Sequence, residues 1–163
     1  MALTPAQLAV VKADIDADPT LSAFPVNSDG AFAIAAIYNT EVNPAWVVWR
    51  SNVSQDEIMQ NGFDWTRVDN LGAGPARIWE WMFNNSGRSF NPSKPNVRAG
   101  IEAVWKGTAA DLAVRAAVYV HCKRNATRLE KLLSTGTGDD ATPATMEFEG
   151  TVSYYDIMNA RNA

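Results

Sequence analysis

Apolar residues recur at steps of three and four along much of the chain, the spacing that places them on one face of a helix. The first such segment starts at Thr4-Pro5-Ala6-Gln7, which combines a capping box with a proline at the first helical position. Leu8, Val11 and Ile15 follow on one face before Pro19. The pattern therefore predicts a helix between Thr4 and Pro19.

Similar signals predict further helices. One is expected after Asn27-Ser28-Asp29, one after the capping box Ser54-Gln55-Asp56-Glu57, and two more over about residues 75–84 and 95–105. Gly62 and Gly107 follow two of these segments and favour their termination.

The longest helical pattern begins after Thr108 and extends to about Ser134. Its expected core-facing stripe consists of Leu112, Ala116, Tyr119, Cys122, Ala126, Leu129 and Leu133. Arg115 interrupts the apolar first half, and its guanidinium must be paired or reach an interface, because an isolated buried charge is costly. Together these segments predict a mainly α fold, a bundle of about five or six helices.

The last part of the chain has a different pattern. Glycines and aspartates at positions 136–140 interrupt the helical periodicity, and residues 146–155 alternate partly, as a short strand does. No second strand candidate lies beside this segment, and a lone strand has unpaired backbone groups along both edges. We therefore expect a helical bundle domain over residues 1–135 and, over 136–163, a Gly/Thr/Asp-rich joint and an extended C-terminal arm with a short β-strand. The arm would pair with a partner chain by strand addition, anchored by Phe148, Val152, Tyr154 and Tyr155.

One segment leaves an alternative to this arm open. Residues 43–50 could form a short strand or a helical turn, and their only plausible β partner inside the chain is the arm itself. The same segment holds two of the six tryptophans, Trp46 and Trp49. Trp79 and Trp105 are expected in the core. Trp81 lies on the other side of its helix from Trp79, so either one of that pair is near the surface or the helix is buried on both sides.

Charge is distributed unevenly along the chain. Residues 1–69 hold nine acidic and three basic side chains, residues 70–134 four and ten, and residues 135–163 five and one, which gives the net charge of −4. Blocks of opposite sign suit a head-to-tail contact between copies, with Arg115, Arg124, Arg128 and Lys131 as charged contacts. The alternative is intramolecular packing of acidic helices beside basic ones. No segment reaches the ~18 apolar residues of a membrane helix, and no secretory signal pattern is present, so no membrane partner is expected.

Candidate catalytic chemistry is sparse. The single histidine, His121, is adjacent to the single cysteine, Cys122, and their side chains point about 100° apart on a helix, so they cannot form a nucleophile–base pair. A zinc site needs more of these residues. We therefore expect no enzymatic activity and no cofactor or metal, and we expect Cys122 to be a small core residue. DNA binding through Lys123, Arg124, Arg128, Lys131 and Arg115 is a weaker alternative, because the sequence pI of about 4.9 is acidic.

Four segments carry a resemblance to a known family. They are Asn91-Pro92-Ser93, Val97-Arg98-Ala99-Gly100-Ile101, the stretch from His121 to Arg128, and Met146-Glu147-Phe148-Glu149-Gly150. These segments resemble a family of small, uncharacterised virion proteins of tailed bacteriophages. In size and layout the chain also resembles the head-to-tail adaptor (connector) proteins of such phages.

The resemblance implies a non-enzymatic structural protein. It implies a homo-oligomeric ring, usually a dodecamer, at the neck of the virion between the portal protein and a tail or nozzle protein. Packaged DNA would pass through the ring without sequence-specific contact, and the chain would be in the host cytoplasm during assembly. Tail completion, tail termination and capsid decoration are the alternative roles in the virion.

Overall fold

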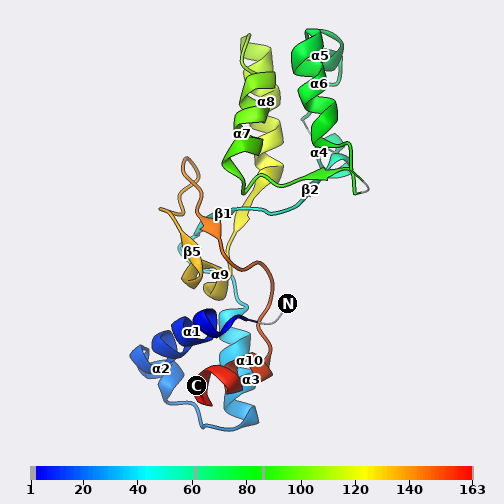
Figure 1. Cartoon of the computed structure of the whole chain (residues 1–163). Helices are drawn as coiled ribbons and strands as arrows, with labels where there is room; N and C mark the ends of the chain where they lie inside the picture. Colours follow the sequence, from blue (N-terminus) through cyan, green and yellow to red (C-terminus); the bar gives the residue numbers. More distant parts are fainter. Residues whose placement is uncertain (1–2, 61, 86, 163) are drawn as a thin grey trace. The chain divides into compact units, whose positions relative to one another are not determined.

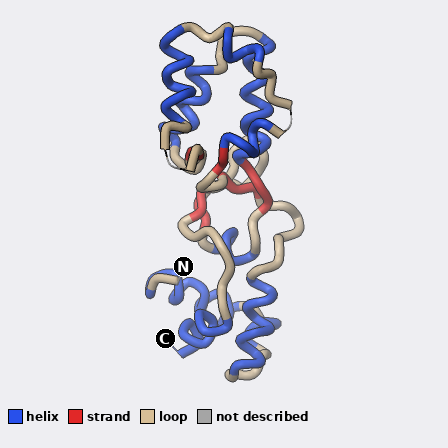
Figure 2. Tube along the Cα trace, turned by 90° about the vertical axis from the view of Figure 1, so that its right-hand side faces the viewer, coloured by secondary structure: helices blue, strands red, loops and turns tan. Residues whose placement is uncertain are grey.

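The computed structural model describes residues 3–60, 62–85 and 87–162 (Figure 1). Within these ranges the chain is mainly helical, which confirms the predicted fold class, and its strands form three small two-stranded antiparallel sheets (Figure 2). Ten helices are described rather than the expected five or six, because several consist of a single turn. None of the helices in these ranges has the length and apolar character needed to cross a bilayer.

The chain divides into two compact units. Unit 1 comprises Met1–Val48 and Asn125–Ala163, and unit 2 comprises Trp49–Arg124. The chain passes between them in β1 (Val47–Trp49) and again in β4 (Lys123–Asn125). This division differs from the predicted one, because residues 136–163 belong to the same unit as the first helices.

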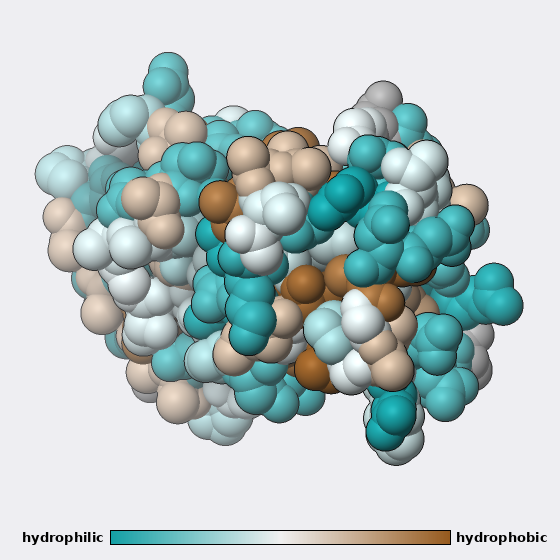
Figure 3. Space-filling view, turned by 90° about the horizontal axis from the view of Figure 1, so that it is seen from above, coloured by the Kyte–Doolittle hydropathy of each residue, from teal (hydrophilic) through white to brown (hydrophobic). Residues whose placement is uncertain are grey.

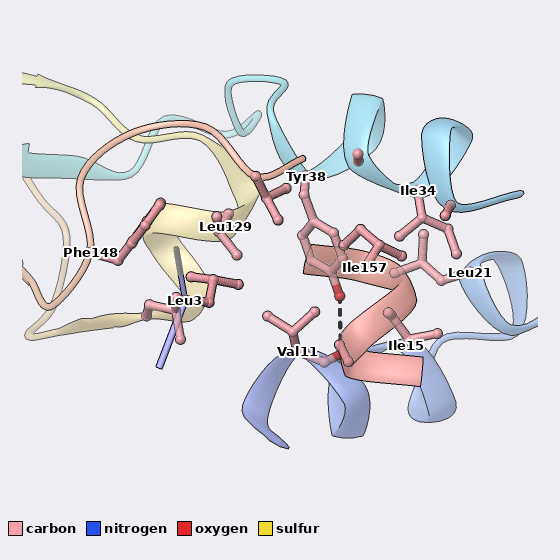
Figure 4. Packing of buried hydrophobic residues seen from close by; sticks show 14 residues of the cluster. Leu3, Val11, Ile15, Leu21, Ile34, Tyr38, Leu129, Phe148 and Ile157 are labelled. Carbon is pink, nitrogen blue, oxygen red and sulfur yellow. Dashed lines mark hydrogen bonds between the residues drawn. The ribbon is translucent and has the colours of Figure 1, made fainter. Parts of the chain in front are cut away.

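Unit 1 is formed by both ends of the chain. Its elements are α1 (Pro5–Ala17), α2 (Pro19–Ser22), α3 (Ser28–Tyr38), α9 (Arg128–Leu132), β5 (Ser134–Thr135), β6 (Thr145–Met146) and α10 (Tyr154–Asn162). Its core lies among α1, α3, α9 and α10, where Val11, Ile34, Tyr38, Leu129 and Ile157 are each fully buried (Figure 4). The Tyr38 hydroxyl donates to Asp14 Oδ2 at 2.7 Å.

Unit 2 is continuous in sequence. Its elements are β2 (Val53–Ser54), α4 (Gln55–Met59), α5 (Thr66–Asp69), α6 (Ala73–Met82), β3 (Ser89–Phe90), α7 (Pro95–Val104) and α8 (Ala109–Cys122). β2 and β3 are antiparallel, with Val53 opposite Phe90. The core is rich in aromatic rings. The ring centroids of Trp79 and Trp105 are 5.4 Å apart in an edge-to-face arrangement, and both residues are buried, as predicted.

Capping boxes set the starts of α1, α4 and α8, and those at Thr4 and Ser54 are predicted from the sequence. Thr4, Ser54 and Thr108 each accept the backbone N–H of the third helical residue, whose side chain accepts the N–H of the cap in return. Asn27 caps α3 by a single bond, in which its Oδ1 accepts the N–H of Gly30 at 3.0 Å. These local signals hold because they depend on residues three positions apart.

The prediction of one long helix from Thr108 to about Ser134 is wrong. It ends at Cys122, and Lys123–Asn125 continues as β4 before the separate helix α9. The reason is a further capping box, in which Thr127 accepts the N–H of Glu130 while the Glu130 carboxylate accepts the N–H of Thr127 at 3.0 Å. A cap needs extended backbone, so the chain cannot remain helical through Thr127.

The prediction of an extended C-terminal arm is also wrong. Its strand is limited to β6, which pairs with β5 inside unit 1 in the register Ser134–Met146 and Thr135–Thr145, and the chain then ends in helix α10. Phe148 and Val152, expected as anchors on a partner, are 5% and 4% exposed within the core of unit 1. The segment thus finds its contacts in its own chain.

The segment around Trp46 resolves the open alternative. β1 pairs with β4, and Val48 also forms an isolated parallel bridge with Ala144, whose N–H donates to Val47 O at 2.9 Å. The Trp46 ring packs against Gly138, where an added Cβ would overlap the ring. The φ of +69° at Gly138 is also one that glycine tolerates best. The prediction that the C-terminal arm is the only β partner of this segment inside the chain is therefore wrong: its strand partner is β4, and it meets the C-terminal part through a single bridge.

Candidate interaction surfaces

Helix α6 has one aromatic residue on each side. Trp79 is 4% exposed in the core of unit 2, whereas Trp81 is 73% exposed. Residues two positions apart on a helix point about 200° apart, so both cannot face the same core. This confirms the prediction that one of the pair lies near the surface.

An apolar groove lies beside Trp81 between α6 and α7. Its volume is about 500 Å³, and it is lined by Gly74, Arg77, Ile78, Trp81, Met82, Asn96, Val97 and Gly100. Ile78 is 40% exposed, so the apolar lining is accessible to solvent. In the space-filling view, hydrophobic residues are recessed between hydrophilic ones (Figure 3). We call this site the α6–α7 groove.

Close approach of the two helices shapes the floor of the groove. A Cβ placed on Gly100 of α7 would lie 2.5 Å from Met82 Cε on α6. The missing side chain therefore leaves room for the Met82 thioether, an adaptable apolar group.

A second, polar hollow adjoins Trp81. It is lined by Gln55, Arg77, Glu80, Trp81, Phe83, Asn84 and Arg88. Arg77 and Trp81 line both hollows, so they form a ridge between them. The Arg77 side chain makes no ion pair with any residue that the structure describes, and its guanidinium is available to an acidic partner.

Unit 1 presents an aromatic row of three rings. Phe32 of α3 stacks on Tyr154 of α10 with ring centroids 4.2 Å apart. The ring centroids of Tyr154 and Tyr155 are 3.9 Å apart. Phe32 is 56% and Tyr155 63% exposed. Of the four predicted arm anchors, Tyr155 is thus the most accessible, Tyr154 is half-buried, and Phe148 and Val152 are core residues.

The predicted charged contacts do not form one stripe. Arg115 and Arg124 belong to unit 2 and are half-buried, whereas Arg128 and Lys131 belong to unit 1. Because the expected helix is broken at Cys122, these residues lie on different elements. The proposed phosphate-binding face along a single helix is therefore lost.

Arg128 and Lys131 have partners inside unit 1. Arg128 Nη2 lies 3.0 Å from Asp14 Oδ2 and 2.8 Å from Asp18 Oδ2. The hydrogen bond from Arg128 is the largest of the interactions that lower the pKa of Asp18. Lys131 Nζ lies 4.9 Å from the centroid of the Trp46 ring. For Arg128 the intramolecular interpretation of the charge blocks holds, whereas the contact of Lys131 is with an aromatic ring.

The buried stripe of α8 is shifted from the predicted one. Val114, Val118 and Cys122 face the core, whereas Leu112 is 43% and Val120 72% exposed. The apolar first half of this helix therefore contributes surface as well as core.

Two buried groups of unit 2, the Asp111 carboxylate and the Cys122 thiol, have shifted pKa values. Asp111 accepts from Arg67 Nη2 at 2.7 Å, and this bond, with the N–H of Thr108, lowers its pKa to about 2. Burial raises the pKa of the Cys122 thiol to about 12, which keeps it protonated. Within the described ranges no group of three or more His, Cys, Asp or Glu side chains could hold a metal ion.

The sequence did not predict the α6–α7 groove. Its residues come from two helices whose packing the periodicity does not specify. The signal that could have indicated it is the apolar pair Ile78 and Trp81, three positions apart on a helix whose other side carries Trp79.

No protein-family model matches this chain, and searches of curated proteins and of solved structures also find no match.

Proposed function

We propose that this chain is a non-enzymatic structural protein of a tailed-phage virion, in the first instance a head-to-tail adaptor. Copies would assemble into a ring between the portal protein and a tail or nozzle protein. Contact would be made by folded surfaces of the two units, since the C-terminal segment is part of the core of unit 1.

The observation that carries this proposal is the exposed Trp81 beside an apolar groove. Large aromatic side chains are enriched at the energetic centres of protein interfaces, because they bury a large surface at a small cost in conformational entropy. A tryptophan that is 73% exposed leaves most of that surface in water, and docking of a protein partner would remove it.

Charge favours protein over nucleic acid as the partner. The chain carries a net charge of −4, and Arg128, the centre of the predicted basic stripe, is occupied by Asp14 and Asp18. Net negative charge opposes non-specific binding to phosphates. It is also compatible with DNA that moves through a ring without adhering to it.

Copy number in purified virions tests the proposal. Quantitative mass spectrometry against the portal protein is expected to give about one ring, a number close to that of the portal subunits. A copy number comparable to that of the capsid protein would instead indicate decoration, and absence from virions would overturn the proposal. A salt-dependent shift of duplex DNA by the purified chain would favour the DNA-binding alternative.

A further inference from the structure

We propose that the α6–α7 groove of one copy receives the aromatic row of unit 1 from a second copy. The contact is head-to-tail: unit 2 of each molecule binds unit 1 of the next. This inference deepens the proposed function, on which it rests for its biological setting, by naming the two surfaces that would join neighbouring copies.

A head-to-tail contact needs two different, complementary patches on the same chain. The described residues provide both. The groove, with Ile78, Trp81 and Met82, is a concave apolar site, and the row formed by Phe32, Tyr154 and Tyr155 presents stacked rings to solvent. Aromatic rings pack well against an indole and against a methionine thioether.

Charge complementarity selects a second copy as the occupant. Unit 1 holds eleven acidic and four basic side chains, a balance of −7, whereas unit 2 holds seven and ten, a balance of +3. Opposite charge steers unit 1 of one molecule toward unit 2 of another and disfavours contacts between like units.

The same complementarity holds at the patches themselves. Arg77 lies on the ridge of the groove and Arg88 lines the adjoining hollow. In unit 1, the exposed Asp29 lies three positions before Phe32, on the same side of α3, and Asp156 follows Tyr155 in α10. A guanidinium at the edge of the groove can therefore pair with a carboxylate beside the aromatic row.

The test is mass photometry and sedimentation equilibrium of the full chain over a range of concentrations. Wild type is expected to form concentration-dependent oligomers. Trp81→Ala and Tyr155→Ala should each weaken self-association roughly tenfold or more, as interface aromatic residues do. Val120→Ala and Val10→Ala, at exposed apolar positions outside both patches, should leave it unchanged.

Mixing the two variants separates this contact from a symmetric one. The Trp81→Ala copy keeps its aromatic row and the Tyr155→Ala copy keeps its groove, so the mixture should form one-to-one dimers that cannot grow further. A charge swap gives a second readout: Arg77→Glu should weaken association, and adding Asp29→Arg should restore it in part.

Three results would overturn the inference: a chain that stays monomeric at its highest soluble concentration, variants that associate like wild type, or a mixture that fails to dimerise. Circular dichroism must show that each variant is folded. Virion copy number is measured independently, so an adaptor that joins through other surfaces would keep the proposed function while this inference fails. If the mixture dimerises but the chain is absent from virions, this inference holds and the proposed function fails.

Discussion

The side chain of Asn39 makes both backbone hydrogen bonds of Val152. Asn39 Nδ2 donates to Val152 O at 2.9 Å, and Asn39 Oδ1 accepts the Val152 N–H at 2.8 Å. Farther back in the same segment, Glu130 Oε1 accepts the Gly150 N–H at 3.1 Å and Leu133 O accepts the Glu147 N–H at 2.9 Å. Two side chains thus perform much of the pairing that a neighbouring strand would provide.

Replacing Asn39 should therefore destabilise unit 1. Asn39→Ala leaves the donor and acceptor of Val152 without partners, at a cost of about 2 kcal/mol in the free energy of unfolding. Asn39→Asp should cost more at pH 7, because a carboxylate oxygen would face the Val152 carbonyl. Its stability should rise as the pH falls and the carboxylic acid becomes a donor. Urea unfolding followed by far-UV circular dichroism at pH 7 and pH 5 measures both effects.

Asn159→Asp is the matched control, since Asn159 is exposed on α10 and its side chain makes no hydrogen bond to any residue within the described ranges. It should differ little from wild type at either pH. An Asn39→Asp variant as stable as this control would contradict the pairing.

The Asn39 contact also explains which predictions failed. A lone strand in a sequence predicts a partner strand, because only strand patterns are visible as possible partners. An asparagine 113 positions away that satisfies the backbone leaves no periodic signal. Capping boxes such as Thr4 with Gln7 were predictable because both residues lie within one turn. Thr127 with Glu130 had the same signature, but the apolar spacing across it concealed the break between α8 and α9.

The site was less predictable than the fold. Exposure of one of Trp79 and Trp81 followed from helix geometry, because the angle between them is fixed by the backbone. The α6–α7 groove depends on how two helices pack, and that depends on small gaps such as the one at Gly100. The predicted interface role of Phe148 depends on an extended arm, and Phe148 instead packs in the core of unit 1.

Phe148 should behave as a core residue. Phe148→Ala removes a ring that is 5% exposed and leaves a cavity, so the free energy of unfolding should fall by about 3–4 kcal/mol. Tyr155→Ala changes a residue that is 63% exposed and should cost less than about 0.5 kcal/mol. Chemical denaturation followed by circular dichroism compares the two. Equal stability of Phe148→Ala and wild type would restore the interpretation of Phe148 as an accessible anchor.

Acid should weaken unit 1 through the cluster at Arg128. The pKa of Asp18 is lowered in the folded state, chiefly by its hydrogen bond from Arg128 and then by the Thr20 N–H. The resulting contribution to the free energy of unfolding is fully present above the unfolded pKa of about 4. It is lost as the pH falls through the lower pKa of the folded state. Arg128→Met should therefore reduce stability at pH 7 and make the decline between about pH 4 and pH 2 shallower.

Two probes can localise that effect. Five of the six tryptophans lie in unit 2 and only Trp46 in unit 1, so fluorescence reports mainly on unit 2 and circular dichroism on both. Arg128→Met should shift the circular dichroism transition more than the fluorescence transition. The control Lys106→Met removes an exposed ammonium group from unit 2, outside the proposed contact, and should leave both transitions in place. An unchanged acid decline in Arg128→Met would show that the cluster contributes nothing.

Cys122 should be inert in the folded protein. Its thiol is fully buried and its pKa is raised to about 12, chiefly by burial, so almost no thiolate exists at pH 8 and reagents cannot reach the sulfur. Labelling with a chromogenic disulfide reagent should be slow without denaturant and rapid once urea unfolds unit 2. A Cys122→Ala, Val120→Cys variant provides the control, because position 120 is 72% exposed on the same helix and its thiol should react at once. Equally fast labelling of Cys122 in the native protein would mean that α8 opens readily and that the core of unit 2 does not hold it.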